Sequence, residues 1–352
     1  MRFFAAQKIL HGDPLLGELP DDRTILQNTL KVAWPSILES FLVSLVSLID
    51  TVMVGGLGAY AIAAVGLTTQ PKFIGMAIFM SLNVAISAVV ARRRGEQDRD
   101  SANRVLTQAI LIVLGLSVII SIICVTFAEP IVVFAGAADD TKGPAADYFR
   151  IIMGGMVFNV LSMAINAAQR GAGNTKIAMR TNIVSNLVNI IFNYLLIGGN
   201  LGFPRLEVRG AAIATVLGTI CALFMSVFSV IHKDHFLCIR EYWSFHFDRK
   251  TLKAIINIGS SSLIEQIFLR IGFLTYSIVV AHLGTVAFAA HQIGMNLMNI
   301  SFSFGDGLSV ASVALVGKSL GEEREDLAKI YGGICQRVGV FIACIISITR
   351  CV

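Results

Sequence analysis

One acidic residue closes a long apolar run early in this sequence, and its setting predicts chemistry. Asp50 follows the run "FLVSLVSLI" and precedes the turn-like stretch "TVMVGGLGAYAIAAVG". An ionisable side chain within a membrane helix is costly, and is taken as functional by default. A carboxylate in that position can exchange a proton for Na⁺ or respond to the occupancy of a pathway. Asp50 is therefore the first candidate for a cation-coupling residue.

Two asparagines later in the chain have the spacing of companions to this carboxylate. Asn189 and Asn193 are four residues apart and share one face of a helix, with Asn186 near that face. Their amide oxygens suit a hard cation such as Na⁺, although asparagines in membrane helices also serve packing alone. Thr215 in "AIATVLG" adds a hydroxyl. We expect no resident metal, only transient Na⁺ at Asp50.

A second set of polar residues lies within apolar runs and is a candidate substrate path. Glu39 and Lys72 are placed at similar depths before and after the turn near Leu57, so they are a candidate buried ion pair. Structural and transport roles are equally open for that pair. The full set is Glu39, Lys72, Glu265, Arg270, His291, Gln292 and Asn296.

Five members of this set lie in the last third of the chain. Arg270 is five residues from Glu265, about 140° away around an ideal helix, so it needs another partner. His291 begins a polar face that continues through Gln292 and Asn296. A hydrogen-bonded packing role is the alternative for this histidine.

The composition identifies the elements that must position these residues. The chain has 352 residues, of which 55% are hydrophobic and 14% charged, whereas soluble proteins carry about 25% charged residues. Long apolar runs predict an all-α, polytopic membrane protein. The nine predicted spans lie near 33–54, 61–90, 105–127, 148–168, 181–198, 210–232, 254–280, 285–316 and 329–349.

Several function classes are disfavoured by the same composition. The hydrophilic segments are short and contain no Ser-His-Asp set, phosphate-cradling loop or metal-ligand cluster, so we expect neither an enzyme nor a cofactor. The six cysteines show no CxxC spacing and no disulfide framework. The net charge of +5 comes from loop residues and does not indicate a nucleic-acid partner.

The distribution of Lys and Arg orients the spans. Loops after even-numbered spans are rich in positive charge, above all "ARRRGEQDRDSANR", and the alternate loops are poor in it. The positive-inside rule therefore predicts a multi-pass protein of the inner (plasma) membrane with a cytoplasmic N-terminus.

An internal repeat divides the chain. Shifting the sequence by 226 residues aligns 35–96 with 261–322 without a gap, and 17 of the 62 positions are identical. Six spans separate equivalent helices, so the repeats run parallel, as in one class of transporter. We predict a tail at 1–30, an N-lobe of six helices at 31–235, a linker at 236–253 and a partial C-lobe at 254–352.

Several stretches together identify a family. The sequences "LVSLIDTVMVGGLGAYAIAAVGL", "RGAGNTKIAM", "NLVNIIFNYLLIGG" and "AAHQIGMNLMNISFSFGDGLSVASVALVGKSLGE" resemble the MATE family of multidrug and toxic-compound extrusion transporters. The resemblance implies twelve helices in two lobes, an N-lobe cation site containing Asp50, and an essential carboxylate near Glu265 in some branches. Three of six C-lobe helices are present, so we expect a C-terminally truncated member.

The resemblance implies a function. We expect an antiporter that exchanges organic, often cationic or amphipathic, compounds for Na⁺ or H⁺ by alternating access. Its partners would be a small-molecule substrate, the coupling ion and the bilayer, and it would act as a monomer. A flippase of lipid-linked saccharides, with Lys72 and Arg270 as internal cations, is one alternative, and an inactive membrane fragment is another.

Overall fold

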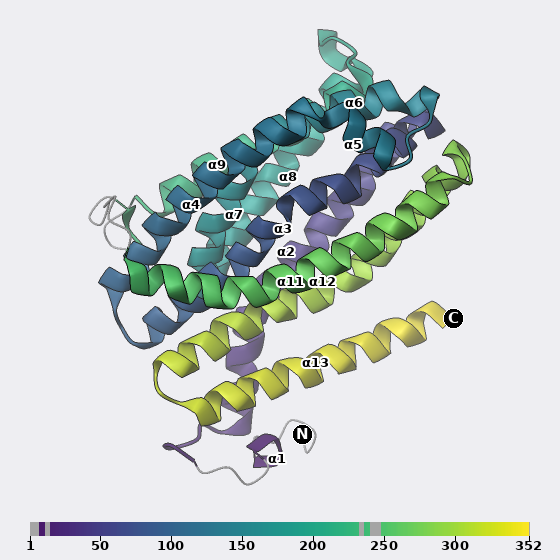
Figure 1. The fold of residues 1–352 in the computed structure, drawn as a ribbon. Helices are drawn as coiled ribbons and strands as arrows, with labels where there is room; N and C mark the ends of the chain where they lie inside the picture. The colour runs from purple at the N-terminus through teal and green to yellow at the C-terminus, as the bar shows by residue number, and fades with distance from the viewer. Residues whose placement is uncertain (1–6, 11–14, 232–235, 240–247, 352) are drawn as a thin grey trace.

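The computed structural model describes residues 7–10, 15–231, 236–239 and 248–351, and all regular elements within these ranges are helical (Figure 1). The prediction of an all-α chain is confirmed. The long helices are α2 (Asp22–Gly55), α3 (Ala59–Gly95), α4 (Arg99–Thr126), α6 (Asp139–Gly154), α7 (Met156–Gly171), α8 (Thr175–Gly198), α9 (Glu207–Ser229), α11 (Arg249–Ala281), α12 (Thr285–Gly321) and α13 (Glu325–Cys351). The short helices are α1 (Gln7–Leu10), α5 (Ala128–Phe134) and the 3-10 turn η1 (Asn200–Gly202).

The helices match the predicted membrane spans. Seven helices in the described residues are long and apolar enough to cross a membrane, and the pair α6–α7, bent by 47°, makes an eighth candidate. The remaining predicted span, 285–316, lies on α12. The main difference is at the start, because α2 begins at Asp22, well before the predicted span.

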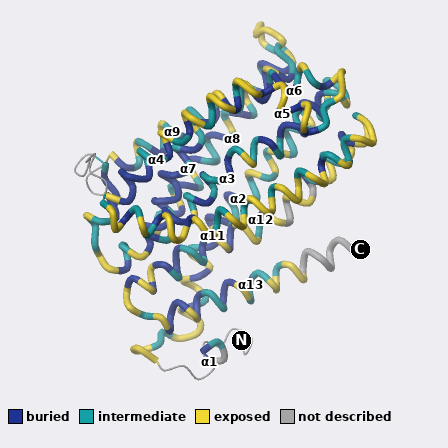
Figure 2. Tube along the Cα trace, in the orientation of Figure 1, coloured by how far each residue is buried: buried dark blue, intermediate teal, exposed yellow. Residues whose placement is uncertain are grey.

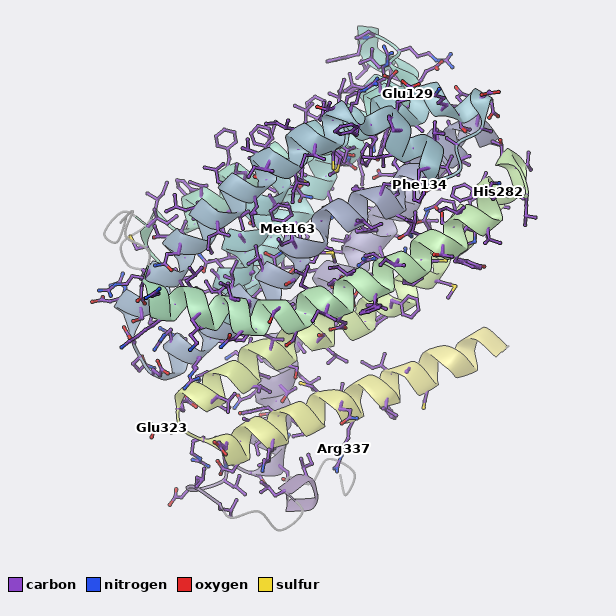
Figure 3. All side chains as sticks on the ribbon, viewed as in Figure 1. Glu129, Phe134, Met163, His282, Glu323 and Arg337 are labelled. Atoms are coloured by element: carbon purple, nitrogen blue, oxygen red, sulfur yellow. The ribbon has the colours of Figure 1, made fainter. Side chains whose placement is uncertain are left out.

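The two repeats form two hairpins that exchange partners. α2 and α3 are joined by a short turn, as are α11 and α12, yet each hairpin's own helices contact one another little. Instead α2 packs on α12, α11 packs on α3, and α3 and α12 pack on each other. We call the end with the two hairpin turns the hairpin end, and the end with the α3–α4 and α12–α13 turns the basic end. Figure 3 labels His282 at the hairpin end and Glu323 at the basic end.

A close crossing of α3 and α12 at the basic end uses repeat-equivalent glycines. A Cβ added to Gly95 would collide with the Lys318 carbonyl oxygen, and one added to Gly321 would collide with the Arg92 carbonyl oxygen. A Cβ on Gly317 would lie 2.8 Å from that of Ala91. Only glycine allows two helix backbones to approach so closely. We call this contact the glycine crossing.

Four apolar clusters lie among the described residues, and two of them are large. The larger core lies among α3, α4, α6 and α7, whose traces carry much of the dark blue of buried residues in Figure 2. Phe79, Leu106, Phe149 and Met153 are fully buried there. The second core joins α1 and the start of α2 to α12 and α13. Much of α11 lies outside these clusters and is exposed, and the middle of α2 is half-buried or exposed.

The predicted division into tail, lobes and linker remains a prediction. Residues 15–18 contact α13: Asp326 accepts the Leu16 N–H at 3.4 Å, and Arg324 donates to the Glu18 carbonyl at 3.1 Å. Residues 240–247 of the predicted linker lie outside the described residues, as do 1–6 and 11–14 of the tail.

The cap of α4 provides a test of local stability. The Asp98 carboxylate accepts the Ser101 N–H at 3.0 Å, and hydrogen bonding from the Ser101 side chain, followed by this N–H, holds the pKa of Asp98 below its ordinary value. We expect Asp98→Ala to cost about 1 kcal/mol of unfolding free energy above pH 5. Because the folded pKa is depressed, the cap's contribution disappears as the pH falls below about 4 and Asp98 protonates. Thermal unfolding in detergent at several pH values, with Asp100→Ala as control, would contradict this if both variants unfolded alike.

Candidate functional site

A cavity of about 200 Å³ lies between the two hairpins, with α6, α8 and α9 completing its wall. Residues from both repeats contribute to it, so it joins the first hairpin to the second. Its polar lining residues are Ser47, Asp50, Thr51, Thr69, Lys72, Tyr148, Asn193, Thr215, Gln292, Asn296 and Asn299. We call it the central cavity.

Asp50 is held by the two asparagines that share its predicted site. Asn193 donates its amide nitrogen to Asp50 Oδ1 at 2.7 Å. The Asn189 amide, oriented to match its neighbours, donates to Asp50 Oδ1 and Oδ2 at 3.0 and 3.2 Å. Its oxygen then faces the Thr215 backbone N–H at 3.2 Å and hydroxyl at 3.1 Å. The structure therefore brings all four residues of the predicted coupling group together.

One acceptor beside this carboxylate is left without a donor. The Asn193 Oδ1 atom is buried and has no hydrogen-bond partner among the described residues. A buried, unpaired oxygen next to a carboxylate requires an explanation, and a cation is one that fits its chemistry. Asn186 does not line the central cavity. Its Nδ2 atom is buried and has no hydrogen-bond partner among the described residues.

Lys72 supplies the positive charge that faces Asp50. Both residues line the central cavity, and their charges interact. The predicted ion pair of Lys72 with Glu39 is therefore wrong. Side chains on a helix tilt towards its N-terminus, so Lys72 leans towards the hairpin end of α3, where Asp50 lies. Glu39 and Lys72 lie at similar depths on α2 and α3, but these two helices contact each other little, so equal depth does not bring the side chains together.

The second repeat reaches the cavity through amides of α12. Asn296 donates to Thr51 Oγ1 at 2.6 Å, and Ser47 donates to Asn296 Oδ1 at 3.5 Å. Thr51 follows Asp50, and Ser47 lies one turn before it. Gln292 lines the same cavity. The carboxylate is thus one residue away from a direct hydrogen bond between the repeats.

Glu39 has a different partner. Its Oε1 accepts from Arg170 at 3.1 Å and from Asn182 at 2.5 Å, and both charged side chains are largely buried. The pair connects α2 to α7 and α8, away from the central cavity. Glu265, the repeat equivalent of Glu39, is exposed, because no described element covers that part of α11. The two glutamates therefore do not share an environment.

The Glu39–Arg170 pair predicts a large effect on stability. Glu39→Gln would leave the Arg170 charge buried without its counter-charge, at a cost of about 3 kcal/mol of unfolding free energy. Denaturant unfolding in detergent measures this cost. The double variant Glu39→Gln/Arg170→Gln is the control, because removing both charges should recover part of the loss. A single variant within about 1 kcal/mol of the original chain would show that the pair does not stabilise it.

The remaining predicted path residues lie outside the central cavity. Arg270 stacks on Phe73 with its guanidinium carbon 4.5 Å from the ring centroid, and donates to Gln266 at 3.3 Å. It therefore has partners other than Glu265, as its helical position predicted. His291 packs edge-on against Tyr276 at 5.2 Å between ring centroids. That contact agrees with the packing alternative for this histidine.

Sequence reasoning missed several cavity residues. Tyr148 comes from α6 and Asn299 from α12, and neither has a spacing that links it to Asp50. Ser47 and Thr51 did carry a signal, since they flank Asp50 on the same helix at distances of three residues and one residue. Small hydroxyl residues are common in membrane helices, so this signal is weak.

Comparison with known proteins identifies the family. The profile of the MatE family matches residues 35–195 and 262–352. The chain belongs to the MatE family. The two matched stretches contain most of the two hairpins, including both turns, and the first contains Asp50, Asn189 and Asn193.

Two individual relatives are identical to this MatE chain at about a quarter of the aligned positions. It is 26% identical over 306 residues to the probable multidrug resistance protein NorM of Thermotoga maritima, covering 86% of this chain and 64% of that relative. It is 25% identical over 319 residues to the multidrug resistance protein NorM of Vibrio cholerae, covering 90% and 69%. The chain thus spans about two thirds of the length of these relatives.

A solved structure has the same fold. The outward-facing conformation of a multidrug resistance MATE family transporter of the MOP superfamily superposes with a TM-score of 0.81 at 23% identity. The match covers 94% of this chain and 74% of that one. At this identity the likeness establishes the fold, and the two parallel repeats of this chain are part of it.

Proposed function

We propose that this MatE chain carries the coupling site of an antiporter that exports organic compounds in exchange for Na⁺ or H⁺. The observation that supports the proposal most is the Asp50 carboxylate, held by Asn189 and Asn193 in a cavity between the two repeats. The unpaired Asn193 Oδ1 adds a second oxygen for a cation. The names of the relatives, which are multidrug resistance proteins, agree with this function.

In this proposal the cavity exchanges positive charges at Asp50. Na⁺ or a proton binds the carboxylate, and the Lys72 ammonium neutralises it when the coupling cation leaves. Movement of one repeat against the other would then expose the cavity to each side in turn. Because the cavity is formed within one chain, the unit of transport would be a monomer. The basic end would face the cytoplasm, together with the N-terminus.

Ion dependence tests the proposal directly. The protein is reconstituted in sealed vesicles with a fluorescent organic cation, and either a Na⁺ or a proton gradient is imposed. We expect one of the two gradients to accelerate movement of the dye at least about tenfold, because only the ion that binds Asp50 can drive exchange. Dye movement that is equal with and without both gradients would reject the antiporter.

A flippase would require a basic cavity, and the observed one does not favour it. Lys72 is opposed by Asp50, and Arg270 lies outside the central cavity. Vesicles with a fluorescent lipid-linked saccharide provide the comparison, and we expect no gradient-dependent movement of that lipid.

A further inference from the structure

A second cavity, at the basic end, has a composition unlike that of the first. Its volume is about 510 Å³, and it lies among α2, α3, the α7–α8 turn, α12 and α13. Four cationic side chains line it, and no acidic residue does: the cations are Lys31, Arg94, Lys176 and Lys318. We call it the basic cavity. Like charges that converge on one space repel one another, so the arrangement favours a bound anion.

The cations of the basic cavity are mostly unneutralised. Within the described ranges, Lys31 and Lys176 have no ion-pair partner. Lys318 has one, Glu322, at 3.5 Å, and that pair is solvent-exposed and therefore weak. Surface lysines that serve only to orient a membrane protein have no need to gather around a single cavity.

Arg94 is the one arginine among the lining residues of this space. Its guanidinium stacks on the Phe236 ring, with its carbon 4.1 Å from the ring centroid. Stacking occupies the face of the guanidinium and leaves its N–H edge available. Such an edge matches the geometry of a phosphate, to which arginine binds through two parallel hydrogen bonds.

The backbone of the α7–α8 turn adds donors to the same cavity. The turn reads "GAGNT", and Gly173 adopts a positive φ of 87° with open space beside its Cα. The 24-residue helix α8 starts at Thr175, and the side chain of Asn174 does not cap its first turn. The first N–H groups of a helix lack internal partners and carry the positive end of its dipole, so they attract an anion.

We propose that the basic cavity binds a phosphate-bearing anion that bridges the two repeats. Arg94 would contact it from the first repeat, Lys318 from the second, and Lys176 from the start of α8. The apolar part of the lining, including Val32 and Leu315, suits a phosphate that carries a glycerol or acyl portion. Two sources share this chemistry: the headgroup of an anionic lipid and a free phosphate compound. A bridging anion would hold together the end where the glycine crossing lies.

Direct binding measurements test this proposal independently of transport. In neutral detergent, phosphatidylglycerol and an uncharged galactolipid with the same acyl chains are compared by native mass spectrometry. Inorganic phosphate and pyrophosphate are titrated by calorimetry. We expect at least one phosphate-bearing probe to bind at least about tenfold more tightly than the galactolipid. Binding of phosphatidylglycerol alone would identify a lipid source, and binding of the soluble anions a free one.

A matched pair of variants separates this site from general charge attraction. Lys176→Gln/Lys318→Gln removes two cavity cations, whereas Lys250→Gln/Lys253→Gln removes two exposed cations at the start of α11 that do not line it. We expect roughly tenfold or greater weakening in the first variant and none in the second. Asn28→Glu, which adds a negative charge to the lining and leaves all four cations in place, should weaken binding as well. Equal losses in the two double variants, or no preference of the original chain for any phosphate-bearing probe, would overturn the proposal.

Discussion

Asp50→Asn is expected to abolish gradient-driven transport, by about 100-fold or more, while the protein still folds. The substitution preserves the shape of the side chain and one oxygen acceptor for Asn193, which donates at 2.7 Å. It removes the negative charge that attracts Na⁺ or holds a proton, and it leaves Lys72 without its counter-charge. Losing a charged hydrogen-bonding partner for the ion costs about 2–3 kcal/mol, which corresponds to about 100-fold.

The measurement must distinguish coupling from folding. Vesicle transport with imposed Na⁺ and proton gradients gives the rate, and thermal unfolding in detergent shows that the variant is intact. Asp100→Asn, which changes an exposed carboxylate at the start of α4, is the control and should transport normally. Asp50→Glu should retain part of the coupling, because it keeps the charge and shifts its position. If Asp50→Asn retains gradient dependence, this residue has no place in the mechanism.

Gly321→Ala is expected to force apart the basic ends of α3 and α12. Its Cβ would collide with the Arg92 carbonyl oxygen and lie 3.0 Å from the Gly95 Cα atom, and neither backbone can yield without moving its helix. Overpacking of this kind costs about 1–3 kcal/mol. If this end must be closed in one state of transport, the ratio of closed to open molecules falls roughly five- to 150-fold.

Distance measurements between spin labels can detect this shift. Labels at Glu96 and Glu323, which are exposed residues just beyond the crossing, report the separation of the two turns. We expect a longer and broader distance distribution in Gly321→Ala than in the original chain. Gly115→Ala is the matched control, since an added Cβ at Gly115 meets no atom within 4 Å. Identical distributions in both variants would mean that the crossing tolerates a side chain.

The sequence predicted the helices and the coupling group for related reasons. Long apolar runs form membrane-spanning helices in almost every case. The 226-residue repeat shows in addition that residues 35–96 and 261–322 form equivalent helices, which no pattern within either stretch could show. The coupling group was predictable because polar side chains in an apolar environment must find polar partners. Asp50 offers a carboxylate on α2, and Asn189 and Asn193 offer two amides on one face of α8. Their contact follows from chemistry more than from any knowledge of the packing.

The partners of the other charges could not be predicted in this way. The position of Lys72 along the chain predicted Glu39 as its partner. The long lysine side chain instead extends towards the hairpin end, where it lines the central cavity together with Asp50. Glu39 instead meets Arg170 from α7, more than 100 residues away, in an arrangement that depends on how α2 packs against α8. Sequence patterns report which face of a helix is polar, and helix packing decides which neighbour that face meets.

The exchange of partners between the hairpins has a consequence for how the protein is made. α2 leaves the ribosome about 226 residues before its repeat equivalent α11, and earlier still than α12, on which it packs. At a synthesis rate of about 5–20 residues per second, Thr51 of α2 waits roughly 12–50 seconds for Asn296 of α12, which lies 245 residues later. During this interval Asp50 and Thr51 lack their neighbours from α12, so the nascent chain must keep them solvated or shielded. The early helices are therefore the part of the nascent chain that most needs lipid or an insertion factor to shield its polar residues.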